Sequence, residues 1–191
     1  MRRALSAGRG GAPIGVDERT RPRYDGAFMA HLLTVDLDEV PEARAISAFA
    51  GARAVAVFVS DADDVAWDPL TPTTAVVALT EEDLALGEWR GPDVADPAPQ
   101  AFDLFPVDVP AAVFYDLFAP GFDVESVDPA LVKLHDELMS ANRIGGPVIH
   151  WSGHTYTEEF FLQCGEEVVD VNLGDTGMLY VFAGTAFSVS H

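Results

Sequence analysis

The sequence predicts an α+β protein made mainly of antiparallel sheets, internally duplicated as a pseudo-two-fold pair, with an acid-rich middle segment. Three observations lead to this prediction. Short apolar runs bounded by turn residues outnumber helical patterns, the two ends of the chain resemble each other, and acidic residues gather between those ends. We expect a single domain over residues 1–191, made of two packed repeats at about 8–60 and 140–191 with a connecting segment at 61–139.

Strands are expected where β-branched and aromatic residues form short, partly alternating runs. A helix is favoured where Thr80 precedes an acidic first turn, and another where Asp128 and Pro129 form a typical helix start. Five prolines between residues 91 and 110 exclude a long helix there. The expected strands are 28–37, 52–60, 74–80, 159–164, 167–172 and 178–183, and the expected helices are 40–49, 81–88 and 130–142.

The internal repeat is the most informative pattern. A glycine pair and a proline stand at residues 10–13 and again at 145–147. In both places a polar loop then leads to a strand that begins with phenylalanine, at Phe28 and Phe160, followed by an acidic stretch and a second apolar strand. Because each copy alone has too few strands to be stable, we expect the two copies to share an apolar face.

The second copy resembles the carboxy-terminal signature of the YwqG-like family of bacterial proteins. The residues that carry the likeness are 141–151 (ANRIGGPVIHW), 159–164 (EFFLQC) and 173–184 (LGDTGMLYVFAG). The first copy is looser, because Thr34 stands where glutamine is usual and no tryptophan follows Pro13. The resemblance implies a duplicated α+β fold in a family without an established activity. Some relatives are similar to proteins encoded near toxins, which implies an immunity or partner-binding role, and no catalytic residue is transferred.

The distribution of net charge along the chain predicts the kind of partner that the protein binds. The chain carries a formal net charge of −20, and residues 61–137 hold eighteen acidic residues against Arg90 and Lys133, a net charge of −16. Such a field repels phosphate backbones and anionic membranes, so neither nucleic acid nor a membrane is an expected partner. It attracts a protein with a basic surface. The alternative is a solvated acidic face, typical of high-GC or salt-adapted genomes.

The apolar runs, the cysteine content and the first residues exclude membrane-spanning, disulfide-stapled and signal-bearing classes of protein. No apolar run approaches the roughly 20 residues of a membrane helix. The single cysteine, Cys164, cannot form an internal disulfide, and residues 1–11 lack the apolar stretch of a signal peptide. We therefore expect a cytoplasmic protein, and the sequence leaves its oligomeric state open.

The leading prediction is a non-enzymatic protein-binding module, such as an immunity factor or an accessory protein for a basic partner. Its expected binding surface is a stretch in which aromatic and acidic residues alternate between prolines. The alternative is that these rings close the core between the two repeats. The expected partner-binding residues are Asp103, Phe105, Asp108, Phe114, Tyr115, Asp116, Phe118 and Asp123.

The alternative function is a metal-assisted or cysteine-dependent hydrolase built on residues 150–164. Cys164 would be the nucleophile, with His150 or His154 as its base and Glu158 beside them. The leading prediction contains no catalytic residue, no metal and no cofactor, because the chain lacks CxxC, HExxH and GxSxG patterns.

The expected strand 28–37 carries several polar residues. Asp36 and Asp38 would share one face about 7 Å apart, a separation that some glycosidases use, although an acidic chain also produces such pairs by chance. His31 is expected either to face solvent or to meet a hydrogen-bond partner in the core.

Overall fold

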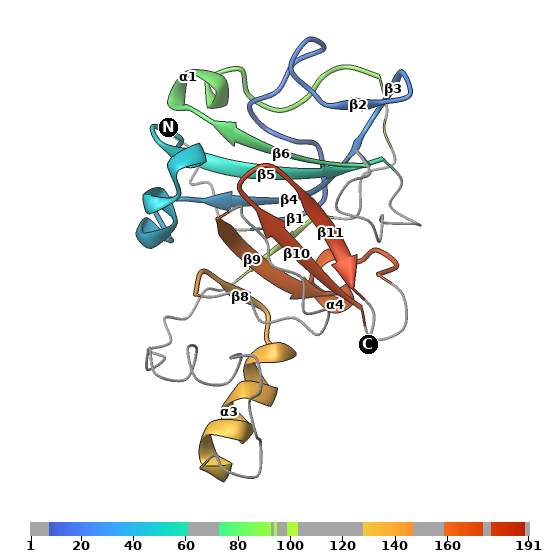
Figure 1. Cartoon of the computed structure of the whole chain (residues 1–191). Coiled ribbons are helices and arrows are strands. Elements are labelled where there is room, and N and C mark those ends of the chain that lie inside the picture. Colours follow the sequence, from blue (N-terminus) through green and yellow to red (C-terminus); the bar gives the residue numbers. More distant parts are fainter. Residues whose placement is uncertain are drawn as a thin grey trace.

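The computed structural model of the chain describes residues 8–60, 73–92, 94, 99–102, 128–146, 159–173 and 177–189. Within these residues the fold is α+β, and every strand pairing is antiparallel, which confirms the expected α+β class with mainly antiparallel sheets. The strands form two larger sheets and one small hairpin (Figure 1).

The first sheet has five strands in the order β6-β5-β4-β1-β7. Its central strands are fully buried, which explains their continuous apolar sequences. The strands are β1 (Gly8–Arg9), β4 (Ala30–Asp36), β5 (Ala54–Val59), β6 (Thr74–Leu79) and β7 (Gln100–Ala101).

The second sheet has four strands in the order β11-β10-β9-β8. They are β8 (Arg143–Ile144), β9 (Phe160–Gly165), β10 (Met178–Phe182) and β11 (Ala186–Val189). The separate hairpin pairs β2 (Arg23–Tyr24) with β3 (Ala27–Phe28). The two larger sheets also meet at one corner, where the Thr74 hydroxyl donates to the Ala186 carbonyl oxygen at 2.5 Å.

Short helices connect the strands. The expected helix at 40–49 is two 3-10 helices, η1 (Pro41–Ala45) and η2 (Ser47–Phe49). In α1 (Glu81–Leu84) the expected capping box is confirmed, because Thr80 and Asp83 each bond the other's backbone N–H. The helix α3 (Pro129–Met139) starts as expected, with the Asp128 side chain accepting from the Ala130 N–H at 2.9 Å. In Figure 1, α3 projects away from both sheets.

The strand expected at 167–172 is wrong. The chain forms a single helical turn there, α4 (Glu166–Val169), which ends where Asp170 adopts a left-handed conformation with φ of 56°. Val169 and Val171 are both buried, so the alternation that suggests a strand arises from a turn and a loop that face the same core.

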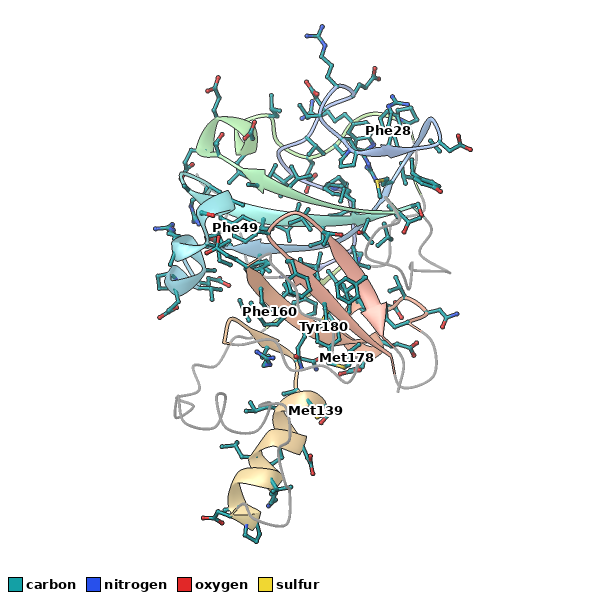
Figure 2. All side chains as sticks on the ribbon, viewed as in Figure 1. Phe28, Phe49, Met139, Phe160, Met178 and Tyr180 are labelled. Atoms are coloured by element: carbon teal, nitrogen blue, oxygen red, sulfur yellow. The ribbon has the colours of Figure 1, made fainter. Side chains whose placement is uncertain are left out.

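One apolar core lies between the two larger sheets and draws side chains from both. Phe49 from η2 contacts Phe161 from β9, with ring centroids 5.0 Å apart in an edge-on arrangement. Figure 2 shows Phe49 at the junction of the two sheets. Leu33, Val55, Val57, Leu162, Leu179 and Val181 belong to the same cluster.

The opposite faces of the sheets are buried differently. The outer face of the first sheet packs against Val16, Met29, Leu84 and Trp89. The outer face of the second sheet carries an aromatic cluster that includes Phe160, Tyr180, Phe182 and Phe187. Arg143 lies 4.8 Å from the Phe160 ring centroid, and its burial lowers the pKa of the guanidinium to about 10.

A bulge interrupts β4 in the first sheet. Leu32 has no partner in β5, since His31 pairs with Phe58 and Leu33 with Val57. The Leu32 carbonyl oxygen instead accepts from the Gly10 N–H at 2.8 Å. The bulge therefore joins β4 to the glycine pair that follows β1.

The second sheet has a matching bulge, in which an unpaired strand residue again bonds the first glycine of a glycine pair. Phe161 has no partner in β10, since Phe160 pairs with Phe182 and Leu162 with Val181. Its carbonyl oxygen accepts from the Gly145 N–H at 2.6 Å. Both residues of each glycine pair have positive φ, a conformation that glycine adopts without steric cost.

Candidate functional site

A groove of about 1180 Å³ lies beside the first sheet. Two buried residues of β4, His31 and Thr34, lie at its base. The segment that includes α1 and the following loop forms one side, and β1, the glycine pair and β7 contribute the other. The groove therefore lies where segments from three parts of the chain meet.

The bulge in β4 determines which side chains reach the groove. In a regular strand His31 and Thr34 would point to opposite faces, but the extra residue Leu32 brings them to the same face. The His31 Nε2 atom lies 2.8 Å from the Thr34 hydroxyl oxygen. The sequence alone does not predict this contact, because side chains alternate between faces along a regular strand and His31 and Thr34 would then lie on opposite faces.

A backbone carbonyl sets the orientation of the His31 ring. The His31 Nδ1 atom lies 3.0 Å from the carbonyl oxygen of Gly11, and a carbonyl only accepts, so Nδ1 carries the proton. In the neutral ring Nε2 is then the acceptor, and the Thr34 hydroxyl donates to it. The hydrogen-bond partner expected for His31 in the core is confirmed.

Arg53 organises the charged end of the groove. Its guanidinium binds the buried carboxylate of Asp36, lies 2.8 Å from Asp38 and lies 3.3 Å from Glu81. Arg44 also pairs with Asp38. Two cations therefore meet three carboxylates, and this network keeps one net negative charge.

The network also corrects the expected carboxylate pair. The strand β4 ends at Asp36, and Asp38 lies in the turn that follows, where its N–H donates to the Asp36 carboxylate at 2.8 Å. Both carboxylates bind Arg53. They are held as partners of a cation and do not form an isolated acid–base pair.

The side of the groove formed by residues 81–88 is called the acidic wall. Glu81, Glu82 and Glu88 of this segment line the groove, whereas Asp83 is held in the capping box of α1. The segment holds no basic residue, but Arg90, two residues beyond it, also lines the groove. Leu86, in the same segment, is 54% exposed, one of two large apolar side chains that are exposed in the described part of the chain. Leu86 is thus one exposed apolar side chain beside these carboxylates, and a single exposed leucine does not by itself mark a contact patch.

Arg9 is a cation beside the groove whose charge is used internally. Its guanidinium lies 3.5 Å from the Asp170 carboxylate and 3.5 Å from the Val168 carbonyl oxygen, both of them next to or within α4. Arg9 thus ties the first sheet to α4 and the residue after it, and its guanidinium adds positive charge to the lining of the groove.

Most of the site residues expected from the sequence lie outside the described residues. This holds for the three polar members of the proposed hydrolase cluster, His150, His154 and Glu158. It also holds for the whole expected partner-binding set: Asp103, Phe105, Asp108, Phe114, Tyr115, Asp116, Phe118 and Asp123.

Cys164 is the one member of the hydrolase cluster within the described structure. It lies in β9 with 3% of its surface exposed and belongs to the core between the sheets. Burial, with a smaller contribution from the Glu167 carboxylate, raises the pKa of the Cys164 thiol. Because the thiolate is the reactive form, this environment disfavours Cys164 as a nucleophile.

Cys164 is therefore expected to resist alkylation in the folded protein. Iodoacetamide at mildly alkaline pH should react with the native protein at least about a hundredfold more slowly than with the urea-unfolded chain. Mass spectrometry of the modified peptide gives both rates directly, since Cys164 is the only cysteine. Equal rates in the two states would show an accessible thiol and would revive the cysteine-dependent hydrolase.

The described ranges give no indication of two other kinds of site. Among these residues, no group of three or more His, Cys, Asp or Glu side chains could hold a metal ion. Nor does this part of the chain contain a helix long and apolar enough to cross a membrane.

The residues that define the groove were not predicted as a site from the sequence: His31 with Thr34, Arg53 and the acidic wall. A usable signal was present in β4, where His31, Thr34 and Asp36 interrupt an otherwise apolar, fully buried strand. Buried polar residues require partners, so several of them in one strand indicate a polar site.

Comparison with known proteins does not assign this groove. No family model, curated protein or solved structure matches the chain. The resemblance to the YwqG-like family stays a prediction, and the function has to be inferred from geometry and charge.

Proposed function

We propose that this chain is a non-enzymatic, cytoplasmic protein-binding module that recognises the basic surface of a protein partner. The observation that carries the proposal is the groove, with its acidic wall and the exposed Leu86 next to it. The resemblance to the YwqG-like family supports a more specific form, in which the chain is an immunity factor that neutralises a basic toxin or an accessory protein for such a partner.

Electrostatics supports a basic partner. The acidic wall presents four carboxylates within eight residues, and the whole chain carries a formal net charge of −20. Such a field raises the association rate of a cationic protein and repels nucleic acid. The exposed leucine adds an apolar contact, which long-range charge alone does not supply.

We also propose that the two larger sheets derive from one repeated unit, with the acid-rich middle as an inserted connection. The matched bulges at Leu32 and Phe161 support this, as do the matched hydrogen bonds from Gly10 and Gly145. A repeat provides two similar scaffolds, of which one can acquire a binding surface while the other keeps the core.

Salt dependence tests the proposed function. A fluorescein-labelled oligo-lysine peptide should bind the protein at low ionic strength, and its Kd should rise steeply with salt as screening shortens the range of the acidic field. Fluorescence anisotropy measures both quantities, and an oligo-glutamate peptide of equal length is the matched control. Absence of oligo-lysine binding at low ionic strength would overturn the proposal.

A further inference from the structure

The helix α3 is attached to the second sheet by a buried side chain of β9. Gln163 is 1% exposed, and its Nε2 atom donates to the carbonyl oxygens of Leu138, Met139 and Ala141 at 2.9, 3.1 and 2.9 Å. The carbonyls of Leu138 and Met139 belong to the last turn of α3, where they have no partner inside the helix. Figure 2 shows Met139 at the end of α3 nearest to this sheet. Gln163 therefore caps a helix that comes earlier in the chain.

The three carbonyls fix the orientation of the Gln163 amide. A carbonyl oxygen only accepts hydrogen bonds, so the amide atom that faces three of them has to be the nitrogen. Turning the amide round would place its oxygen against three other oxygens. The side chain therefore has one favourable orientation, and it holds the end of α3 only in that orientation.

Asn142 provides a second anchor just after the helix. Its side-chain oxygen accepts from the Gly165 N–H at 2.8 Å, and its amide nitrogen donates to the Glu167 carboxylate at 2.8 Å. Gly165 is the last residue of β9, and Glu167 lies in α4. Gln163 and Asn142 together are called the clamp, and they hold residues 138–142 against the end of β9.

The rest of α3 makes few contacts with the described part of the chain. None of its described side chains is buried, and no other described helix or strand packs extensively against it. In Figure 1 the helix projects away from both sheets. It has 11 residues, and isolated helices shorter than about 12–15 residues are only marginally stable in water. The helical order of α3 therefore depends on the clamp.

We propose that the clamp controls an order–disorder transition of α3. While Gln163 and Asn142 hold residues 138–142, α3 is a helix docked on the second sheet, and when the clamp opens, α3 unfolds as a unit while both sheets stay folded. The sheets can stay folded because their shared core draws no described side chain from α3. This inference is independent of the proposed function, since neither clamp residue lines the groove.

Hydrogen exchange followed by mass spectrometry tests the clamp with a matched pair of variants. Gln163→Met keeps the length of the side chain but removes its donor, and Gln100→Met makes the same substitution in the exposed strand β7, at the other glutamine of the chain. We expect the amides of α3 to exchange at least about tenfold faster in Gln163→Met than in the wild type, with less than about a twofold change in β5 and β10. Gln100→Met should leave the exchange of α3 unchanged.

A second variant opens the clamp from its exposed side. Asn142 is exposed, so Asn142→Ala is expected to fold even if Gln163→Met does not. We expect this variant to speed the exchange of α3 at least about threefold and to leave β5 and β10 as in the wild type. Unchanged exchange of α3 in the folded variants would overturn the inference, because the helix would then not depend on the clamp. Equal acceleration in α3 and β10 would also overturn it, since the helix and the second sheet would then unfold together.

Discussion

The Arg53→Met variant is expected to lose about 3–5 kcal/mol of unfolding free energy, because the substitution leaves the buried Asp36 carboxylate without its cation. Asp36 is 3% exposed, and Arg53 contacts both of its carboxylate oxygens. The same guanidinium also reaches Asp38 and Glu81. Urea unfolding followed by circular dichroism measures the loss.

A matched control separates burial from charge. Arg44 also pairs with Asp38, but both side chains are about half exposed, at 44% and 53%. The Arg44→Met variant should therefore lose no more than about 1 kcal/mol. The double variant Asp36→Leu/Arg53→Met should recover much of the loss, because no buried charge then lacks a partner. Similar losses in Arg53→Met and Arg44→Met would contradict the role given to Arg53.

A second large effect is expected in the core between the sheets. The Phe161→Ala variant should lose about 3–5 kcal/mol, since it removes a fully buried ring and leaves a cavity. Phe161 stands at the bulge of β9 and packs edge-on against Phe49 from the first half of the chain. Its loss should weaken the contact between the sheets as well as the second sheet itself.

Thermal unfolding monitored by calorimetry tests the Phe161 prediction. The expected result is a single transition at lower temperature, because the two sheets share one core. The Leu86→Ala variant is the control, and its exposed side chain should contribute no more than about 0.5 kcal/mol. Two separate transitions in the wild-type protein would contradict the shared core.

Much of the strand framework can be predicted from the sequence, because long buried strands carry strong β-branched patterns. The strands β4, β5, β6 and β10 fall within expected runs, and β9 extends one residue beyond its run. Two-residue strands such as β1 and β8 give no pattern of their own, since their pairing depends on the glycine pairs that follow them. The valines at 168, 169 and 171 suggest a strand where a helical turn forms, because the turn and the loop after it place all three against the same core, with Val168 only partly buried.

The groove illustrates a different limit. Strand alternation places His31 and Thr34 on opposite faces, and only the unpaired Leu32 brings them together. Arg53 joins residues that are far apart in the sequence, and no local pattern records its contact with Glu81. The charge pattern favours a basic partner, and the surface that we propose for it is the acidic wall. The partner-binding residues expected from the sequence lie outside the described residues.

The most direct test of the central proposal is charge reversal on the acidic wall. The variant Glu82→Lys/Glu88→Lys changes two exposed carboxylates at the groove, and the control Glu18→Lys/Glu42→Lys changes two exposed carboxylates away from it, with the same change in net charge. The Kd for the fluorescein-labelled oligo-lysine peptide, measured by fluorescence anisotropy, should rise at least about tenfold in the first variant and less than about threefold in the control. Equal increases in the two variants would contradict a binding site at the acidic wall.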